Sequence, residues 1–337
     1  MLKVRGLHVH FPIKKGLVFD RVVGAVRAVD GIDVTVPHGS TLGLVGESGC
    51  GKSTVGKAII RLVPITAGTV SHGDVELSSL EGAELRAARR HVQMIFQDPY
   101  SSLNPRQNVG SIIGEPVRTH SLREGSAVEA RVRELLDSVG LPRDAASRYP
   151  HEFSGGQRQR IGIARALAAE PSLIIADEPV SALDVSIQAQ VINLLEQLQA
   201  DLDLTFLMIS HNLAVVHHIS DNVAVMYLGT IVERATAAAL YAEPLHPYTL
   251  ALLSAVPVPD PEVEDRRSRI VLRGDLPSAA NPPSGCRFRT RCPFVEERCS
   301  VEVPELRSFG PDHEVACHFV EKVRAAAGSV GGVGSLS

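Results

Sequence analysis

Residues 46–54 have the sequence GESGCGKST, and this stretch decides the fold. It matches the pattern G-x-x-x-x-G-K-[ST] and follows a short apolar run, Leu42 to Val45, that is typical of a buried strand. Glycines at these spacings let the backbone turn tightly, so that successive N–H groups converge on phosphate oxygens at the start of the next helix. The pattern therefore predicts a phosphate-binding loop between a strand and a helix, rather than an ordinary glycine-rich turn.

Each residue type in the loop suits a nucleotide phosphate. We expect Lys52 to reach the β- and γ-phosphates, Ser53 to ligate a magnesium ion that bridges them, and Thr54 to add a phosphate contact. Cys50 occupies a variable position of the motif, where a filler is favoured over a redox role. The full set expected around the phosphates is Gly46, Glu47, Ser48, Gly49, Cys50, Gly51, Lys52, Ser53 and Thr54.

A second apolar run ends in two carboxylates, LIIADEP at residues 173–179. Such a run predicts a central parallel strand, and the carboxyl ends of these strands are where doubly wound sheets bind ligands. Asp177 is then a candidate magnesium partner. Strand side chains alternate, so Glu178 points elsewhere and is free to orient an attacking water as the catalytic base.

The stretch FSGGQRQR, residues 153–160, resembles the signature motif of ABC-type ATPases. Ser154 is a good helix N-cap, and the next residues show helical spacing at Ile161, Ala164 and Leu167. The resemblance implies an α/β fold with a P-loop ABC ATPase core and an inserted helical subdomain. It also implies that two subunits close around ATP, with the signature of one facing the phosphate loop of the other. The signature residues are Ser154, Gly155, Gly156 and Gln157.

The same resemblance assigns further sites. Gln97, in VQMIFQDPYSSLNP, is similar to the Q-loop glutamine that contacts magnesium, and His211 to the catalytic switch histidine. Phe11 matches the aromatic residue that stacks on adenine, but an insertion at residues 12–26 separates it from the next strand, and Phe19 is a rival. The D-loop that crosses the dimer interface would consist of Ser181, Ala182, Leu183 and Asp184.

Composition fits a globular chain without a membrane span of its own. The 337 residues are 44% hydrophobic, enough for a sizeable core. The 34 basic and 38 acidic residues nearly balance, so nucleic acid is not an expected partner. No apolar run approaches the ~20 residues of a membrane helix, and the N-terminus lacks a signal-peptide pattern. We therefore expect a cytosolic chain that reaches a membrane only through other subunits.

Hydrophobic spacing divides the chain into regions. Alternating Ile32, Val34 and Val36 predict a strand, and residues from about 98 to 165 carry helix patterns such as 127–139 that predict the inserted subdomain. Strands and helices resume from about 170 to 235. The predicted helix over 186–202 has one apolar face, more typical of core packing than of a partner surface: Ile187, Val191, Leu194, Leu195, Leu198 and Leu202. We predict an ATPase domain over residues 1–242.

Composition changes after Glu243, because eleven of the 21 prolines lie between Pro244 and Pro311. Such a stretch cannot form a long-helix domain and predicts a separate region over residues 243–324. Together with YPHEFSGGQRQRIGIARAL and DEPVSALDVSIQAQVINLL, it resembles the ATP-binding subunits of oligopeptide and dipeptide importers, nearest to the second of the two ATPase subunits that such importers usually carry. Residues 325–337, rich in Gly and Ser towards the end, are expected to be a disordered tail.

That resemblance implies ATP and Mg²⁺ as cofactors and a peripheral place on the cytoplasmic face of the cell membrane. The implied partners are a related ATPase subunit forming a heterodimer, two membrane permease subunits and an external solute-binding protein. A nickel or other small-solute importer remains an alternative, because close relatives share this C-terminal region. A soluble ABC ATPase is a further alternative, but its usual coiled-coil insertion or second ATPase unit is not evident in the sequence.

Four of the five cysteines, Cys286, Cys292, Cys299 and Cys317, fall within 32 residues. In a cytosolic protein such clustering favours a metal site over disulfides, and four thiolates suit either zinc or a four-iron cluster. The spacing does not choose between these metals. Related peptide importers hold an iron-sulfur cluster at such cysteines, so the resemblance favours a 4Fe-4S cluster, with free thiols as the alternative.

Overall fold

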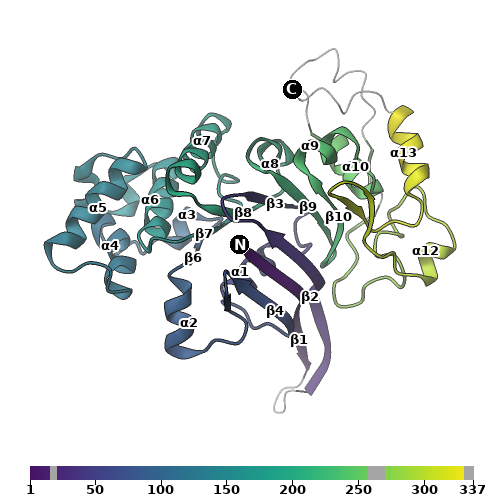
Figure 1. The fold of residues 1–337 in the computed structure, drawn as a ribbon, viewed down its shortest axis with the longest axis horizontal. Helices are drawn as coiled ribbons and strands as arrows, with labels where there is room; N and C mark the ends of the chain where they lie inside the picture. Colours follow the sequence, from purple (N-terminus) through teal and green to yellow (C-terminus); the bar gives the residue numbers. More distant parts are fainter. Residues whose placement is uncertain (16–20, 257–269, 273, 330–337) are drawn as a thin grey trace. The chain divides into compact units, whose positions relative to one another are not determined.

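The computed structural model describes residues 1–15, 21–256, 270–272 and 274–329 (Figure 1). The chain forms two compact units, and each is built from several segments. The first unit comprises Met1–Lys3, Thr35–Thr41 and Val70–Ile209. The second comprises Val4–Val34, Leu42–Thr69 and the described residues from Ser210 onward. These boundaries differ from the predicted division at residue 242, which stays a prediction.

The first unit contains three parallel strands in the order β6 (Val92–Ile95), β7 (Leu173–Asp177) and β8 (Thr205–Ser210). Ile175 of β7 lies opposite Met94 of β6 and Leu207 of β8. Every residue of β7 and β8 is buried, as continuous apolar runs between neighbouring strands require. The strand expected from LIIAD is thus confirmed.

Most of the remaining elements of this unit are helices (Figure 1). Between residues 98 and 165 every regular element that the structure describes is helical, which confirms the predicted helical insertion. These elements are α3 (Pro99–Ser102), α4 (Val109–Thr119), α5 (Ser126–Ser138), two 3₁₀ turns (Arg143–Ser147 and Pro150–Glu152) and α6 (Gly155–Leu167). Helix α2 (Gly82–Arg89) precedes β6 and was not expected, and the short strand β5 (Val75–Glu76) pairs with β4 (Ala67–His72).

Helix α7 (Val185–Leu202) packs against α6. Four of the six residues expected on its buried face are buried: Val191, Leu194, Leu195 and Leu198. Ile187 is half-buried, and Leu202 is 52% exposed, so its assignment to the core was wrong. The reason is local, since Leu202 is the last helical residue and Asp203 then turns the chain in a left-handed conformation with φ 52°.

The second unit contains β1 (Leu2–Lys15), β2 (Arg21–Val36), β3 (Thr41–Val45), β9 (Asn222–Tyr227) and β10 (Thr230–Thr236). Strand β3 pairs in parallel with β9, and β10 returns antiparallel to β9. Ile32, Val34 and Val36 of β2 are all buried, as their alternation predicted. Residues 12–15 and 21–26, expected to be an insertion, instead extend β1 and β2, because valines suit paired strands.

Short elements follow β10, as the prolines predicted: α9 (Ala237–Ala242), α10 (Pro247–Ser254), α12 (Arg298–Val301), β11 (Arg307–Gly310), β12 (His313–Val315) and α13 (Val320–Ser329). Strand β12 pairs antiparallel with β10 and with β11, so the C-terminal region adds two strands to the ladder that begins at β3. Helix α13 extends to Ser329, so the expected disorder of residues 325–329 was wrong. Residues 330–337 of the expected tail lie outside the described residues.

A buried carboxylate and a shared core join the residues after 243 to the strands before them. Glu233 of β10 is fully buried and accepts hydrogen bonds from the Leu245 and His246 backbone N–H groups and from His313 Nε2. Tyr248 and Phe288 lie in the same hydrophobic cluster as β3 and β9 residues. The C-terminal region therefore shares its core with the strands that carry the phosphate loop.

Two glycines of α6 offer a matched test of its packing. A Cβ on Gly156 would lie 2.5 Å from Ile187 Cγ2, whereas a Cβ on Gly162 would meet nothing within 4 Å. We expect Gly156→Ala to destabilise the fold by about 1–3 kcal/mol through overpacking. Gly162→Ala should stabilise it by about 0.5–1 kcal/mol, because alanine is the better helix former. Calorimetric unfolding midpoints should move in opposite directions, and a shared direction would contradict this packing.

Candidate nucleotide-binding and catalytic site

The phosphate loop follows β3 in the second unit and depends on two glycines. Gly51 is the N-cap of α1 (Lys52–Ile59) with φ 110°, and a Cβ there would lie 2.1 Å from the Ala28 carbonyl oxygen. At Gly46, with φ 153°, a Cβ would lie 2.2 Å from the Met226 carbonyl oxygen. No other residue could bring the loop so close to these two strands. The loop predicted from the motif is confirmed as a strand–turn–helix element.

Lys52 is buried, with 4% of its surface exposed. Its Nζ donates hydrogen bonds to the carbonyl oxygens of Gly46, at 2.7 Å, and of Glu47, at 3.0 Å. Ser53 and Thr54 follow in the first turn of α1 and are half-buried. The loop thus holds the lysine charge close to the N-terminus of α1, and both features favour the binding of an anion.

The Cys50 thiol is 1% exposed, and Lys52 Nζ lies 3.8 Å from its sulfur. Burial raises the pKa of the thiol and outweighs the nearby ammonium, which acts in the opposite direction. A protonated thiol is a poor nucleophile. This environment agrees with the interpretation of Cys50 as filler.

Glu47 has an environment that the motif did not predict. Its backbone N–H donates to the Tyr248 hydroxyl at 2.7 Å, and its carboxylate accepts two hydrogen bonds from Arg291, at 2.6 and 3.0 Å. Both partners belong to the region after 243. The sequence contained only a weak indication of the Glu47–Arg291 pair. A carboxylate within a phosphate loop suggests a nearby cation, but the sequence did not identify which one.

The acidic pair lies in the first unit. Asp177 ends β7 and is 3% exposed. Glu178 has left-handed φ of 47°, and its N–H donates to the Ile209 carbonyl of β8 at 2.8 Å. Glu178 thus follows the strand in a left-handed turn and does not continue the strand alternation on which the sequence argument relied. A left-handed conformation is uncommon for glutamate and is a frequent property of functional residues.

Gln97 and Glu178 are brought together from different parts of the first unit. The Gln97 amide Nε2 donates to the Glu178 carboxylate at 2.7 Å. Ser181, the first residue of the expected D-loop, donates from its hydroxyl to the Glu178 carbonyl at 3.1 Å. Three residues that were singled out separately thus form one hydrogen-bonded group.

The signature residues begin α6. Ser154 is its N-cap, and its hydroxyl accepts from the Gln157 backbone N–H at 3.3 Å, while the Gln157 side chain accepts from the Ser154 N–H at 3.0 Å. This reciprocal capping box confirms the expected helix start. A Cβ on Gly155 would lie 3.4 Å from Leu183 Cδ2, so the signature and the expected D-loop are neighbours within the unit. Ala182 and Asp184 of that loop are exposed.

His211 and Phe11 both belong to the second unit. His211 is exposed and directly precedes Asn212, which caps α8 (Leu213–Ile219). Phe11 lies in β1 and is half-buried. Its rival Phe19 lies outside the described residues. No contact described in the structure decides whether Phe11 stacks on adenine, so that role stays a prediction.

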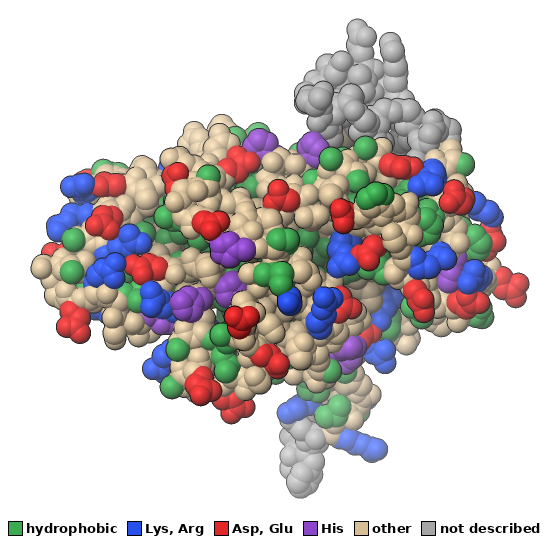
Figure 2. Space-filling view, viewed as in Figure 1, with side chains coloured by type: hydrophobic (Ala, Val, Ile, Leu, Met, Phe, Trp, Pro, Cys, Tyr) green, Lys and Arg blue, Asp and Glu red, His purple; other side chains and the backbone are tan. Residues whose placement is uncertain are grey.

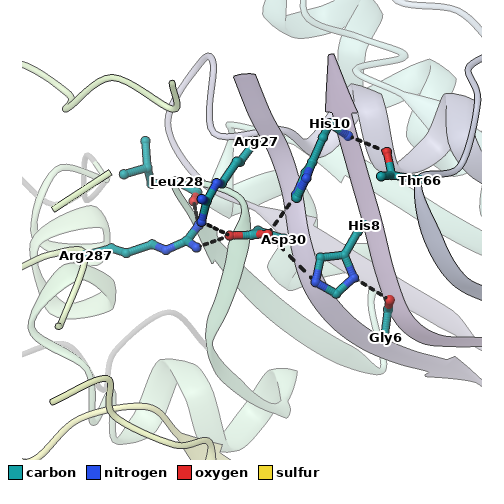
Figure 3. Close-up of polar contacts among 8 residues, drawn as sticks. All are labelled: Gly6, His8, His10, Arg27, Asp30, Thr66, Leu228 and Arg287. Carbon is teal, nitrogen blue, oxygen red and sulfur yellow. Dashed lines mark hydrogen bonds and ion pairs between the residues drawn. The ribbon is translucent and has the colours of Figure 1, made fainter. Parts of the chain in front are cut away.

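In the second unit, a polar cluster surrounds Asp30 (Figure 3). Its carboxylate accepts a hydrogen bond from His10 Nε2 at 2.7 Å and pairs with Arg287, while Arg27 lies 3.8 Å away. Arg287 also donates to the Leu228 carbonyl at 2.6 Å. Burial acts to raise the pKa of Asp30, but the hydrogen bonds from Arg287 and His10 outweigh it, and the pKa lies below the ordinary 3.8.

None of the five cysteines forms a disulfide. Burial raises the pKa of Cys292 to about 12 and of Cys317 to about 11, and the charges of the other clustered cysteines contribute to both shifts. These sulfurs accept hydrogen bonds from the backbone N–H groups two residues later, Phe294 and Phe319, each at 3.4 Å. The four thiols thus lie within electrostatic range of one another. In the part of the chain that the structure describes, no group of three or more His, Cys, Asp or Glu side chains is arranged to hold a metal ion.

Two features concern partners and membranes. On the face drawn in Figure 2, acidic and basic side chains are interspersed over the described residues. Among the described helices, none is both long and apolar enough to cross a membrane.

Comparisons with known proteins agree with these elements. The ABC transporter family model matches residues 29–181, and the model for the oligopeptide/dipeptide transporter C-terminal region matches residues 232–299. The oligopeptide transport ATP-binding protein AppF of Bacillus subtilis is 56% identical, over 95% of this chain and 97% of its own length. Its counterpart OppF of Escherichia coli is 54% identical, over 95% of this chain and 96% of its own length.

Solved structures show the same fold. A dimeric ATP-binding cassette in a post-hydrolysis state, bound to ADP and Pi, superposes with a TM-score of 0.63 and 25% identity, over 70% of this chain and 99% of that one. The cbiO1 protein of Clostridium perfringens superposes with a TM-score of 0.61 and 23% identity, over 72% of this chain and 90% of that one. The predicted α/β ABC ATPase fold is therefore confirmed.

The Asp30 cluster predicts a pH-dependent contribution to stability. Because the pKa of Asp30 is lower in the folded state than in the unfolded state, its contribution is fully present above about pH 4 and is lost as pH falls through the folded pKa. We expect Asp30→Asn to lower the free energy of unfolding at pH 7. The difference in this free energy between wild type and the variant should become smaller below pH 4. Urea unfolding from pH 3 to 7 measures this, with the exposed Asp74→Asn as control. A difference that does not change with pH would contradict the assignment.

Proposed function

The chain belongs to the oligopeptide transport ATP-binding proteins of the ABC transporter family, and from this premise we propose that it hydrolyses ATP to power the import of peptides across a membrane. The observation that carries the proposal is the presence, in one chain, of an ABC ATPase core and the C-terminal region found in oligopeptide and dipeptide transporters. Relatives above 50% identity over nearly the whole length bear oligopeptide transport names, which supports peptides as the cargo.

The chain's own residues account for nucleotide binding. The loop N–H groups and the buried Lys52 would hold the β- and γ-phosphates, and Phe11 would stack on adenine. Ser53, Gln97 and Asp177 have the oxygen donors that Mg²⁺ prefers, so these three would hold the ion. When bound, Mg²⁺ neutralises charge on the phosphates and polarises the bond that breaks. The residues present fit this ion, since Asp177 is a buried carboxylate at a strand end.

For hydrolysis, we assign Glu178 as the base that accepts a proton from the attacking water, and His211 as a donor to the γ-phosphate. The hydrogen bond from Gln97 and the left-handed backbone fix the Glu178 carboxylate before substrate arrives. A preset carboxylate need not reorganise during the reaction. His211 is exposed, as a residue that meets a nucleotide from solvent must be.

The active assembly in this proposal contains two ATPase subunits. The N-terminal turn of α6, with Ser154, Gly155, Gly156 and Gln157, would face the nucleotide held by the other subunit. Val185, directly after the D-loop, is 82% exposed, which suits a residue covered by a partner. We infer a related, non-identical ATPase as that partner, two permease subunits, an external solute-binding protein, and a peripheral position on the cytoplasmic face of the cell membrane.

We further propose that Cys286, Cys292, Cys299 and Cys317 hold one metal centre, a 4Fe-4S cluster or zinc. The proposal is supported by the chemistry of four free thiols in one region and by the backbone N–H groups that donate to the Cys292 and Cys317 sulfurs. In the described part of the chain these thiols are not arranged around a metal ion, so the proposal requires them to move together when the metal binds. Backbone N–H groups that donate to the sulfurs are among the features that tune iron–sulfur centres. Such a centre would fasten a proline-rich region and so be coupled to its folding.

Two variants separate binding from hydrolysis. Glu178→Gln should keep ATP affinity but slow hydrolysis by about 10²- to 10⁴-fold, the usual contribution of a positioned base. Lys52→Ala should weaken ATP binding itself, because it removes the buried charge inside the loop. Nucleotide titration and phosphate release from the assembled transporter measure the two effects.

Transport is tested in the same variants. Cells carrying Glu178→Gln should lose uptake of a labelled oligopeptide, while uptake of radioactive nickel should be unaffected. Wild-type hydrolysis rates in Glu178→Gln would show that this carboxylate is not the base. Loss of nickel uptake with peptide uptake intact would replace peptide by nickel as the cargo.

The metal proposal is tested by purifying the full chain without oxygen. Iron and sulfide in equal amounts and absorption in the visible range are expected, and Cys292→Ser should lower both the iron content and the unfolding midpoint. Cys50→Ser, outside the cluster, is the matched control and should leave the metal content unchanged. Zinc alone would keep the site but exclude the iron cluster, and a metal-free protein would contradict the proposal.

A further inference from the structure

All three polar groups of Glu47 in the phosphate loop have partners within the second unit. Its N–H donates to the Tyr248 hydroxyl, its carboxylate pairs with Arg291, and its carbonyl accepts from Lys52 Nζ at 3.0 Å. The first two partners come from the C-terminal region, and the third is the lysine of the loop itself. Glu47 therefore lies between the C-terminal region and the group that meets the phosphates.

The Arg291 contact is strong by geometry. Its guanidinium donates two hydrogen bonds to the Glu47 carboxylate, at 2.6 and 3.0 Å, and its side chain is only 8% exposed. A two-point pair of this kind fixes direction as well as distance. The Arg291 N–H in turn donates to the Phe288 carbonyl at 3.0 Å, which fixes the backbone behind the side chain.

Tyr248 is held equally firmly. The residue is fully buried, and its ring contacts Tyr227 and Phe288 with centroid distances of 4.8 and 5.5 Å. Its backbone N–H donates to His246 Nδ1 at 3.1 Å, at the start of α10. The ring cannot move without disturbing this aromatic cluster, so the hydroxyl reaches the Glu47 N–H from a fixed position.

A second route from the same region reaches the other side of the loop. Arg287 donates to the Leu228 carbonyl at 2.6 Å, and the next residue, Gly229, donates its N–H to the Cys50 carbonyl at 2.9 Å. A Cβ on Gly229 would lie 2.9 Å from the Arg27 carbonyl, so this turn is tightly packed. Residues 287–291 thus contact the loop directly at Glu47 and indirectly at Cys50.

We propose that Tyr248 and Arg291 are positioning residues for ATP binding, which hold Glu47 so that the phosphate loop keeps its shape and Lys52 keeps its place. The inference rests on the proposed role of residues 46–54 as the ATP phosphate site. Without the two contacts, Glu47 can rotate, and the carbonyl that receives Lys52 moves with it. The loop must then be ordered by the nucleotide, and that ordering lowers affinity.

The test measures ATP affinity on the full chain and steady-state kinetics on the assembled transporter. Tyr248→Phe removes only the hydroxyl and keeps the ring packing, and should weaken ATP binding about fivefold, as expected for one neutral hydrogen bond. Arg291→Gln should weaken it about thirtyfold, since the pair is charged, and Arg291→Lys should lie between, because lysine cannot form the two-point contact. The effect should fall on KM, with kcat within about twofold of wild type.

Two controls make the result specific. Arg298→Gln removes an exposed ion pair with Glu302 from the same region and should leave ATP affinity unchanged. In a double-mutant cycle, Glu47→Gln combined with Arg291→Gln should bind ATP no worse than Arg291→Gln alone, because both act through one contact.

The outcomes separate this inference from the proposed function. If wild type does not bind ATP, or Lys52→Ala binds as tightly as wild type, the phosphate site itself is misassigned. If Lys52→Ala fails to bind while Tyr248→Phe and Arg291→Gln bind like wild type, only the positioning role is wrong. The positioning role would also be wrong if Arg298→Gln weakened ATP binding as much as Arg291→Gln, or if the effects of Glu47→Gln and Arg291→Gln on ATP affinity were additive. Either result would show a general loss of structure and not the loss of one shared contact.

Discussion

The phosphate loop depends on backbone packed against backbone at two glycines. The Ala28 and Met226 carbonyls occupy the space where a Cβ of Gly51 or Gly46 would stand, so the loop closes only when both side chains are absent. Within the loop, Lys52 is buried and donates hydrogen bonds to the Gly46 and Glu47 carbonyls. Other residues of the second unit contact the same loop. Gly229 donates its N–H to the Cys50 carbonyl, and Tyr248 and Arg291 form hydrogen bonds with Glu47.

The C-terminal region is part of the structure that supports the loop, and not a separate attachment. Its residues enter the hydrophobic cluster of β3 and β9, and β12 continues the strand ladder from β10. Buried Glu233 makes three hydrogen bonds to residues beyond the predicted boundary, and a buried carboxylate without them would be costly. The region also reaches the loop itself, because the Tyr248 hydroxyl accepts the Glu47 N–H and Arg291 donates to the Glu47 carboxylate.

The sequence predicted those features that depend on local pattern. Apolar runs located β3 and β7, the Ser154 cap located the start of α6, and the glycine spacing located the loop. It could not predict the partners of Glu47, because Arg291 is 244 residues away along the chain and no periodicity connects them. The β11–β12 hairpin was also missed, because each of its strands has at most four residues and shows no clear alternation. The Gly310-Pro311-Asp312 turn was a usable signal for it.

The argument from strand alternation does not apply to Glu178, because β7 ends one residue earlier, at Asp177. Glu178 instead has a left-handed conformation, and its N–H donates to the Ile209 carbonyl. Such a conformation costs free energy unless neighbours hold it. Ser181 binds the Glu178 carbonyl, and Gln97 binds its carboxylate. Gln97 and Glu178 are therefore one hydrogen-bonded unit, so that a displacement of Gln97 necessarily changes the environment of the Glu178 carboxylate.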